Sequence, residues 1–272
     1  MVIESLMGPL KAKKKPWDMF FIGIVYSSMA VLFSLFIFRE YASMIMIFFT
    51  VMASVPLMYR AVKVEEKIDL KFQEEKFLIK EHGKALSFFM CLFVGFMVSF
   101  SLWYIFLPAD ISNDLFSIQV KEIAKAENVI TGNAISMIRV FSIIFFNNLM
   151  VMLFSLLFSL FYGVGSIFIL TWNASIIGAA IGMFVKGASH INYFASIPVG
   201  VLRYSIHGLP EMLAYFMAGL AGGIISVAVI RHDFGSGKFR RILLDSFDLV
   251  LLSIVVLFIS SLIEVFVTPV LF

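Results

Sequence analysis

The residues best suited to chemistry are two acidic side chains within apolar stretches, Glu211 and Glu264, and a histidine, His207, four residues before Glu211. A carboxylate in hydrocarbon costs several kcal/mol unless it is paired, hydrogen-bonded or facing water. Residues four apart share a helix face, so His207 and Glu211 point to the same side of a helix. One imidazole and two carboxylates suit a divalent metal ion, which makes His207, Glu211 and Glu264 a candidate metal set.

Two adjacent amides, Asn147 and Asn148, interrupt another apolar stretch. With a rise of about 1.5 Å per residue, Glu211 lies roughly 5 Å and the two amides roughly 13 to 15 Å below the outer face of a membrane core. Glu264 lies roughly 25 Å from the inner face of a core about 30 Å thick, which is again the outer third. We therefore predict a polar cluster of Asn147, Asn148, His207, Glu211 and Glu264 in the outer half of the membrane.

Two chemical interpretations fit this predicted cluster. In the simpler one, neutral Glu or Asn side chains hydrogen-bond between helices and lock the spans together. In the other, the cluster binds a divalent metal ion, with amide oxygens helping. The segment His207-Gly-Leu-Pro-Glu211 is not the His-Glu-x-x-His pattern of metalloproteases, so no catalytic residue is assigned.

The composition places these residues in a membrane protein. The chain is 61% hydrophobic and 14% charged, whereas a soluble domain carries roughly 25% charged residues. A spanning helix needs about 20 mostly apolar residues. The predicted fold is therefore an all-α, polytopic integral membrane protein with seven spans, at 19–38, 42–58, 86–107, 138–161, 166–185, 208–230 and 247–271.

The basic residues predict the orientation of the spans. They gather at 11–15, 59–85 and 231–241, beside alternate ends of the spans. Short loops rich in Lys and Arg stay in the cytoplasm, so we expect a plasma-membrane protein with a cytoplasmic N-terminus and an extracytoplasmic C-terminus. Charges placed in this way favour membrane lipid as a partner and do not form a nucleic-acid patch. The single cysteine, Cys91, excludes an internal disulfide.

Three segments between the spans carry structure of their own. The charged segment 59–85 is interpreted as a cytoplasmic helical extension of spans two and three, or alternatively as a partner-docking helix. Segment 112–128 mixes apolar and charged residues as an amphipathic helix on the outer membrane surface would, and 194–206 is similar. We divide the chain into an N-terminal part, 1–137, with three spans, and a four-span core, 138–272.

Small residues recur four apart on two of the predicted spans. Gly178 and Gly182 lie on the fifth span, and Gly219 and Gly223 on the sixth. This spacing lets helix backbones approach closely. The simpler interpretation packs the fifth span against the sixth, and the alternative uses the glycines across a homodimer. Pro210 is expected in the first turn of the sixth helix, where a missing N–H costs nothing.

Several of these features occur together in a known family. They are Asn147-Asn148, the glycines Gly163 and Gly165, Asn173 with Gly178 and Gly182, the pattern His207-Gly208-x-x-Glu211, Arg231, and the ending Ile263-Glu264-Val-Phe-Val-Thr268-Pro269. Over about residues 139–270 the chain resembles the stage II sporulation protein M family. In that family the residue after the fifth-span Asn is often Gly, whereas this chain has Ala174.

The resemblance implies a membrane scaffold, because in spore-forming bacteria members of the family work with peptidoglycan-degrading partners during engulfment. We therefore expect a non-enzymatic protein that forms a homodimer or larger oligomer, or assembles with other membrane proteins. One alternative is a transporter or channel that passes a cation or small polar solute along the membrane carboxylates. Another is a metal-dependent intramembrane enzyme, although no nucleophile stands beside the candidate metal set.

Overall fold

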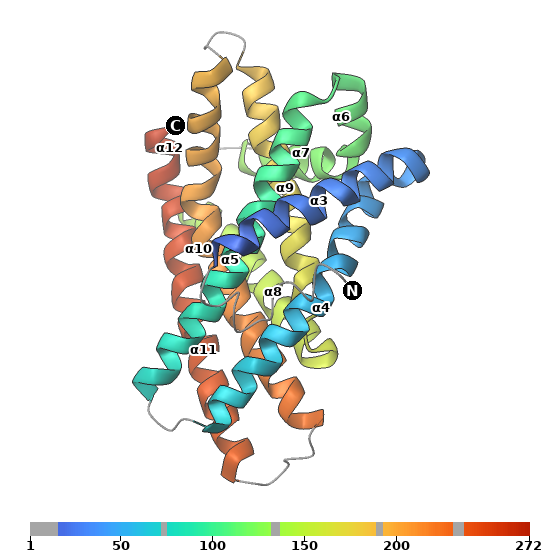
Figure 1. The fold of residues 1–272 in the computed structure, drawn as a ribbon. Coiled ribbons are helices and arrows are strands. Elements are labelled where there is room, and N and C mark those ends of the chain that lie inside the picture. The colour runs from blue at the N-terminus through green and yellow to red at the C-terminus, as the bar shows by residue number, and fades with distance from the viewer. Residues whose placement is uncertain (1–15, 72–74, 132–136, 189–192, 231–236) are drawn as a thin grey trace.

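The computed structural model describes residues 16–71, 75–131, 137–188, 193–230 and 237–272 (Figure 1). Every regular element in these ranges is helical, which confirms the predicted fold class. The elements are α3 (Trp17–Ile37), the 3₁₀ turn η1 (Arg39–Tyr41), α4 (Ala42–Lys71), α5 (Glu75–Phe106), α6 (Ala109–Leu115), α7 (Ser117–Thr131), α8 (Met137–Tyr162), α9 (Ser166–Gly187), α10 (Tyr193–Ile230), α11 (Gly237–Leu262), the π-helical turn η2 (Ile263–Val267) and α12 (Thr268–Leu271).

Seven helical stretches of the described residues are long and apolar enough to cross a membrane, the number predicted. They are Trp17–Ile37, Arg39–Glu65, His82–Phe106, Met137–Tyr162, Ser166–Gly187, Ala195–Ile230 and Phe239–Leu271. The second and third stretches belong to α4 and α5, which continue as helices into the charged segment between them. This matches the simpler interpretation of 59–85 as an extension of two spans.

The sixth helix is longer than predicted. It begins at Tyr193, so Pro210 lies in its interior and not in its first turn, and the segment 194–206 is part of the same helix. A proline removes one hydrogen bond of the helical ladder, but spanning helices tolerate it when a neighbouring helix satisfies the freed backbone groups. The sequence suggested a start near Gly208 because Pro is common in first turns.

The bundle is built around α10 and α5 (Figure 1). Within the best spanning window of α10, 78% of the residues are buried, against 17% for α8. α8 and α11 pack along α10, whereas α3 crosses α5 obliquely, with Gly23 facing Gly95 at the crossing. One core cluster extends from Met19 to Leu257 and so crosses the predicted division at residue 137.

The positions of the helix ends agree with the prediction that successive loops lie at opposite ends of the bundle. The C-terminal ends of α4 and α10 lie at one end of the bundle, and the C-terminal end of α9 lies with α12 toward the other (Figure 1). The basic residues near the ends of α4 and at the start of α11 therefore share one side. Segment 11–15 and residues 231–236 lie outside the described residues, and the side that faces the cytoplasm stays a prediction.

The segment predicted to lie on the outer membrane surface is tied into the bundle. Gln119 of α7 is fully buried; its Oε1 accepts a hydrogen bond from Ser43 of α4 at 2.8 Å, and its Nε2 donates to Ser175 of α9 at 3.1 Å. A buried amide needs such partners because an unsatisfied polar group is costly. Gln119 therefore links α7 to two spans through its side chain.

Candidate functional site

His207 joins α10 to the C-terminal part of the chain. Ser260 of α11 donates a hydrogen bond to the backbone carbonyl oxygen of His207 at 2.7 Å. The missing N–H of Pro210 leaves the carbonyl of Ile206 without its helical donor, so the bond from Ser260 to His207 is a separate link between α10 and α11. The His207 ring adds a second link, because its Nδ1 lies 3.3 Å from the hydroxyl oxygen of Thr268.

Glu211 is held by a tyrosine one turn further along α10. The hydroxyl of Tyr215 donates to Oε1 of Glu211 at 2.7 Å. Tyr215 is fully buried, and a buried tyrosine hydroxyl usually finds a partner, which here is the carboxylate. The hydrogen bond therefore fixes the direction of the Glu211 side chain within the membrane.

Glu264 belongs to the C-terminal segment. It lies in η2, which contacts both α10 and α8. Among the residues that the structure describes, none donates a hydrogen bond to the Glu264 carboxylate. Of the two carboxyl groups, only that of Glu211 therefore has a hydrogen-bond donor in the described part of the chain.

The π-helical turn sets the direction of Glu264. A single π turn inserts one extra residue into an α-helix and rotates the side chains that follow, and such turns occur frequently at functional sites. The Thr268 hydroxyl bonds the carbonyl oxygen of Ile263 at 3.2 Å across this turn. A hydroxyl has one hydrogen and two lone pairs, so Thr268 can donate to Ile263 and accept from the His207 ring at once.

A cationic side chain, Arg203, lies on the same helix, one turn before His207. Its guanidinium carbon lies 5.6 Å from the ring centre of Phe184 in α9 and 5.8 Å from that of Tyr204. These cation–π contacts hold Arg203 beside α9 rather than in contact with the two carboxylates.

The two amides of the predicted cluster point to different sides of α8. Asn148 is 9% exposed and shares the buried stripe of α8 with Met152, Ser155 and Ser159, whereas Asn147 is exposed. Ser155 donates to the carbonyl oxygen of Tyr215 at 3.0 Å, and counting back along both helices places Asn148 roughly 5 Å beyond the height of Glu211. Neither amide forms a hydrogen bond with another described residue.

The structure thus links His207 to Ser260 and Thr268, which lie four residues before and after Glu264, and links Glu211 to Tyr215. Asn148 lies near the height of Glu211 and Asn147 faces outward, and the cluster of five residues stays a prediction. Within the described ranges, no group of three or more His, Cys, Asp or Glu side chains is placed to hold a metal ion. The metal set His207, Glu211 and Glu264 stays a prediction without geometric support. The hydrogen bonds of His207 link α10 to α11 and α12, whereas the bond between Tyr215 and Glu211 lies within α10.

The predicted glycine contacts are partly wrong. Gly178 and Gly182 of α9 face Phe100 and Tyr104 of α5, and not α10. A Cβ on Gly219 would lie 2.6 Å from the hydroxyl oxygen of Ser166, so at this one position α10 does meet α9. Small residues repeated four apart indicate that another helix approaches closely, but they do not identify which helix it is.

Gly223 completes the set and lies against the turn between α8 and α9. A Cβ there would be 2.6 Å from the carbonyl oxygen of Gly163 and 2.9 Å from Cγ1 of Val62. All four glycines are thus occupied by contacts within the chain. They leave no support for the alternative in which these glycines form a homodimer interface.

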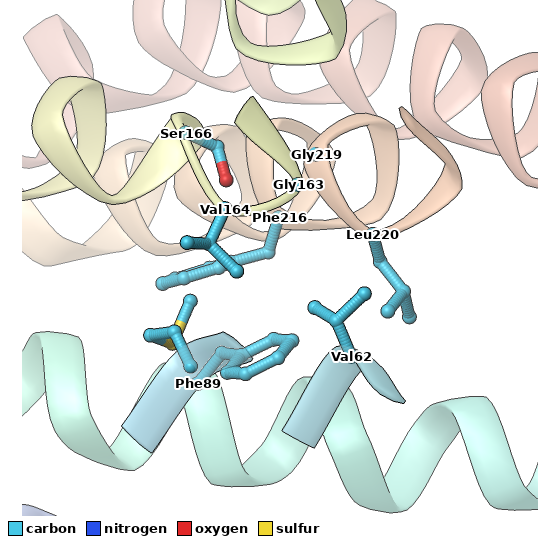
Figure 2. Close-up of a pocket in the computed structure, with 9 residues that line it drawn as sticks. Val62, Phe89, Gly163, Val164, Ser166, Phe216, Gly219 and Leu220 are labelled. Carbon is cyan, nitrogen blue, oxygen red and sulfur yellow. The ribbon is translucent and has the colours of Figure 1, made fainter. Parts of the chain in front are cut away.

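A small cavity lies beside this turn (Figure 2), and its lining includes neither Glu211 nor Glu264. It has room for about one water molecule. Gly219 on its wall is eight residues from Glu211, which is about 12 Å along α10. Its lining is mostly apolar and consists of Met58, Val62, Phe89, Gly163, Val164, Ser166, Phe216, Gly219 and Leu220. The cavity lies where α4, α5 and α10 meet the turn before α9, and its mostly apolar lining does not favour a polar solute.

Three partners of the site were missed by sequence reasoning: Tyr215, Ser260 and Thr268. Each is four residues from a predicted site residue, Tyr215 from Glu211 and the other two from Glu264. Spacing of four on a helix would have placed them on the same faces. Hydroxyl residues are common in spanning helices, however, so the spacing alone carries little information.

The fold and these contacts define a class: a polytopic helical membrane protein in which polar side chains link a central helix to the C-terminal segment. The family model described as Stage II sporulation protein M matches residues 84–269, which is more than half of the chain. The chain therefore belongs to that family. The match begins well before residue 139 and includes the third span, where the sequence had shown us no resemblance. Searches of curated proteins and of solved structures found no match.

Proposed function

We propose that this protein is a non-enzymatic scaffold of the plasma membrane that assembles with itself or with other membrane proteins. The proposed orientation has a cytoplasmic N-terminus and an extracytoplasmic C-terminus, from the placement of the basic residues. Family membership supports a scaffold, but the role in sporulation that the family description names is not carried over to this chain.

One observation carries the proposal: the polar groups around α10 are used to join helices. His207 of α10 accepts a hydrogen bond from Ser260 of α11 through its carbonyl and meets Thr268 of α12 through its ring. Ser155 of α8 also donates to the backbone carbonyl of Tyr215 in α10. Hydrogen bonds of this kind stabilise helix association in a membrane by roughly 0.6–2 kcal/mol each. A C-terminal segment that is hydrogen-bonded to α10 suits a protein that presents its surfaces to partners.

The test is to ask whether the full chain forms complexes in its own membrane. Chemical crosslinking in native membranes, followed by purification of the tagged chain and mass spectrometry, should give crosslinked species larger than the monomer. A chain that stays monomeric in native membranes and in lipid nanodiscs, with no crosslinked neighbour, would contradict the proposal.

A second function, passage of a cation or small polar solute, is favoured by Glu264. This carboxylate lies in a π-helical turn that contacts α10, and it has no hydrogen-bond donor among the described residues. Intramembrane carboxylates often mark ion or proton pathways. Liposomes that contain the purified chain should then show ion flux, and Glu264→Gln and Glu211→Gln should both abolish it. If the scaffold proposal is right, wild-type liposomes will show no flux above empty ones.

A further inference from the structure

One face of α8 is the most open surface of the bundle. Only 17% of the spanning window of α8 is buried, the lowest share of the seven spans. Its buried stripe is narrow, and the rest of the helix carries large exposed apolar side chains, among them Phe146 at 61% exposure and Met150 at 54%. In a membrane such a face meets either lipid or another protein.

Asn147 lies in the middle of this open face. It is the eleventh of the 26 residues of α8, so it is about 15 Å from the start of the helix and about 22 Å from its end. Phe146 and Met150 flank it on the exposed side, and its amide has no hydrogen-bond partner among the described residues. Lipid chains have no group that can bond an amide, so a partner that brings its own donor and acceptor is favoured there.

The chemistry of the amide indicates which partner fits. The Asn side chain offers both a donor and an acceptor, so two such amides facing each other across a two-fold axis can exchange two hydrogen bonds. Two copies of one chain have the same orientation in a membrane and hold Asn147 at the same depth. Between Ser142 and Tyr162 the helix has no charged residue that would select a partner of opposite charge.

We propose that the open face of α8 is the interface with a second copy of this chain, with Asn147 paired to Asn147 of the second copy at its centre. Arg139, exposed near the start of α8, lies on the same side. The two helices must therefore separate toward that end so that both guanidinium groups reach the water. The closest contact then lies at Asn147 and along the apolar residues after it. This inference names the partner for the self-assembly in the proposed function, and it rests on that function.

The chain supplies its own matched control, because Asn148 is the same residue type at the next position and is buried on the inner side. Cys91 is first replaced by Ser, and Asn147→Cys and Asn148→Cys are made separately in that background. After oxidation in native membranes, or treatment with a short bifunctional thiol reagent, Asn147→Cys should give a crosslinked dimer. Asn148→Cys should remain monomeric.

A second measurement does not depend on crosslinking. Dimerisation in lipid bilayers is measured by energy transfer between labelled copies of the wild-type, Asn147→Leu and Asn147→Gln chains. Asn147→Leu should weaken dimerisation roughly 3- to 30-fold for each hydrogen bond that is lost between the membrane helices. Asn147→Gln retains the donor and acceptor and should stay closer to wild type. Because Asn147 is exposed, neither change should disturb the fold of a single chain.

Three results would overturn the inference, and they separate it from the proposed function. If wild-type dimers form but Asn147→Cys crosslinks no more than Asn148→Cys, the interface lies elsewhere while self-assembly stands. If a photoreactive residue at position 147 captures a different protein, the second copy is the wrong partner. If the chain is monomeric and has no crosslinked neighbour, both the inference and the proposed function fail.

Discussion

Replacing Gly223 with alanine should push the turn between α8 and α9 away from α10. The added Cβ would lie 2.6 Å from the carbonyl oxygen of Gly163, well inside the 3.4 Å at which ordinary contacts begin. Gly163 has a positive φ of 73°, a conformation that glycine adopts without strain, so this turn is tightly defined. The added Cβ would also lie 2.9 Å from Cγ1 of Val62, so the helix cannot relieve the contact by moving toward Val62.

The expected magnitude is the difference of two effects. Overpacking a tight contact costs about 1–3 kcal/mol. Replacing glycine by alanine within a helix returns about 0.5–1 kcal/mol. Gly223→Ala should therefore lower the free energy of unfolding by roughly 0.5–2 kcal/mol. Gly83 of α5 is the matched control, because a Cβ there meets nothing within 4 Å. Gly83→Ala should raise the free energy of unfolding by about 0.5–1 kcal/mol.

The assay compares thermal unfolding of both variants and the wild type in one detergent. A change of 1 kcal/mol shifts the midpoint by about 2–4 °C for chains of 150–250 residues, so the two variants should lie roughly 2–12 °C apart on opposite sides of wild type. Equal shifts in the same direction would refute the reasoning. They would mean that the backbone contact at Gly223 does not limit the approach of the turn to α10.

Three further predictions concern hydrogen bonds. A double-mutant cycle of Tyr215→Phe and Glu211→Leu should give a coupling free energy of about 0.5–3 kcal/mol, and additivity of the two changes would contradict their hydrogen bond. Ser260→Ala should lower stability in detergent by about 0.6–2 kcal/mol, because the His207 carbonyl loses its donor; an unchanged midpoint would count against the link to α10. Gln119→Leu leaves two buried hydroxyl groups without their amide partner and should cost about 1–3 kcal/mol, with faster proteolysis of α7; unaltered cleavage would show that α7 is held by other contacts.

The number of spans could be predicted because the bilayer imposes one rule on every segment. About 20 apolar residues must run together to cross it, and the charged segments that separate such runs are easy to find. Helix ends were less predictable. Pro210 suggested the first turn of a helix, yet α10 begins at Tyr193, because a spanning helix packed against neighbouring helices tolerates a proline in its interior. Such compensation depends on a neighbour that is distant in the sequence.

The site was predictable in part for a related reason. Glu211 and Glu264 stand out because charge is rare in apolar runs, and the spacing of four predicted that His207 and Glu211 share a face. The hydroxyl groups that hold them do not stand out, because Ser, Thr and Tyr are ordinary residues in spanning helices. Gly178 and Gly182 were correctly predicted as close contacts, but their neighbour is α5, and spacing carries no information about which helix approaches.

Asn147 and Asn148 show most clearly where local information ends. Hydropathy places both within a span, because that depends only on the composition of about 20 neighbouring residues. Large apolar residues occur all around α8, so the spacing of its apolar residues does not mark the side that is buried. Packing against α10 and α11 decides that Asn148 faces inward and Asn147 outward. Depth in the membrane follows from the order of residues along the chain, but the direction of a side chain follows from the helices that pack around it.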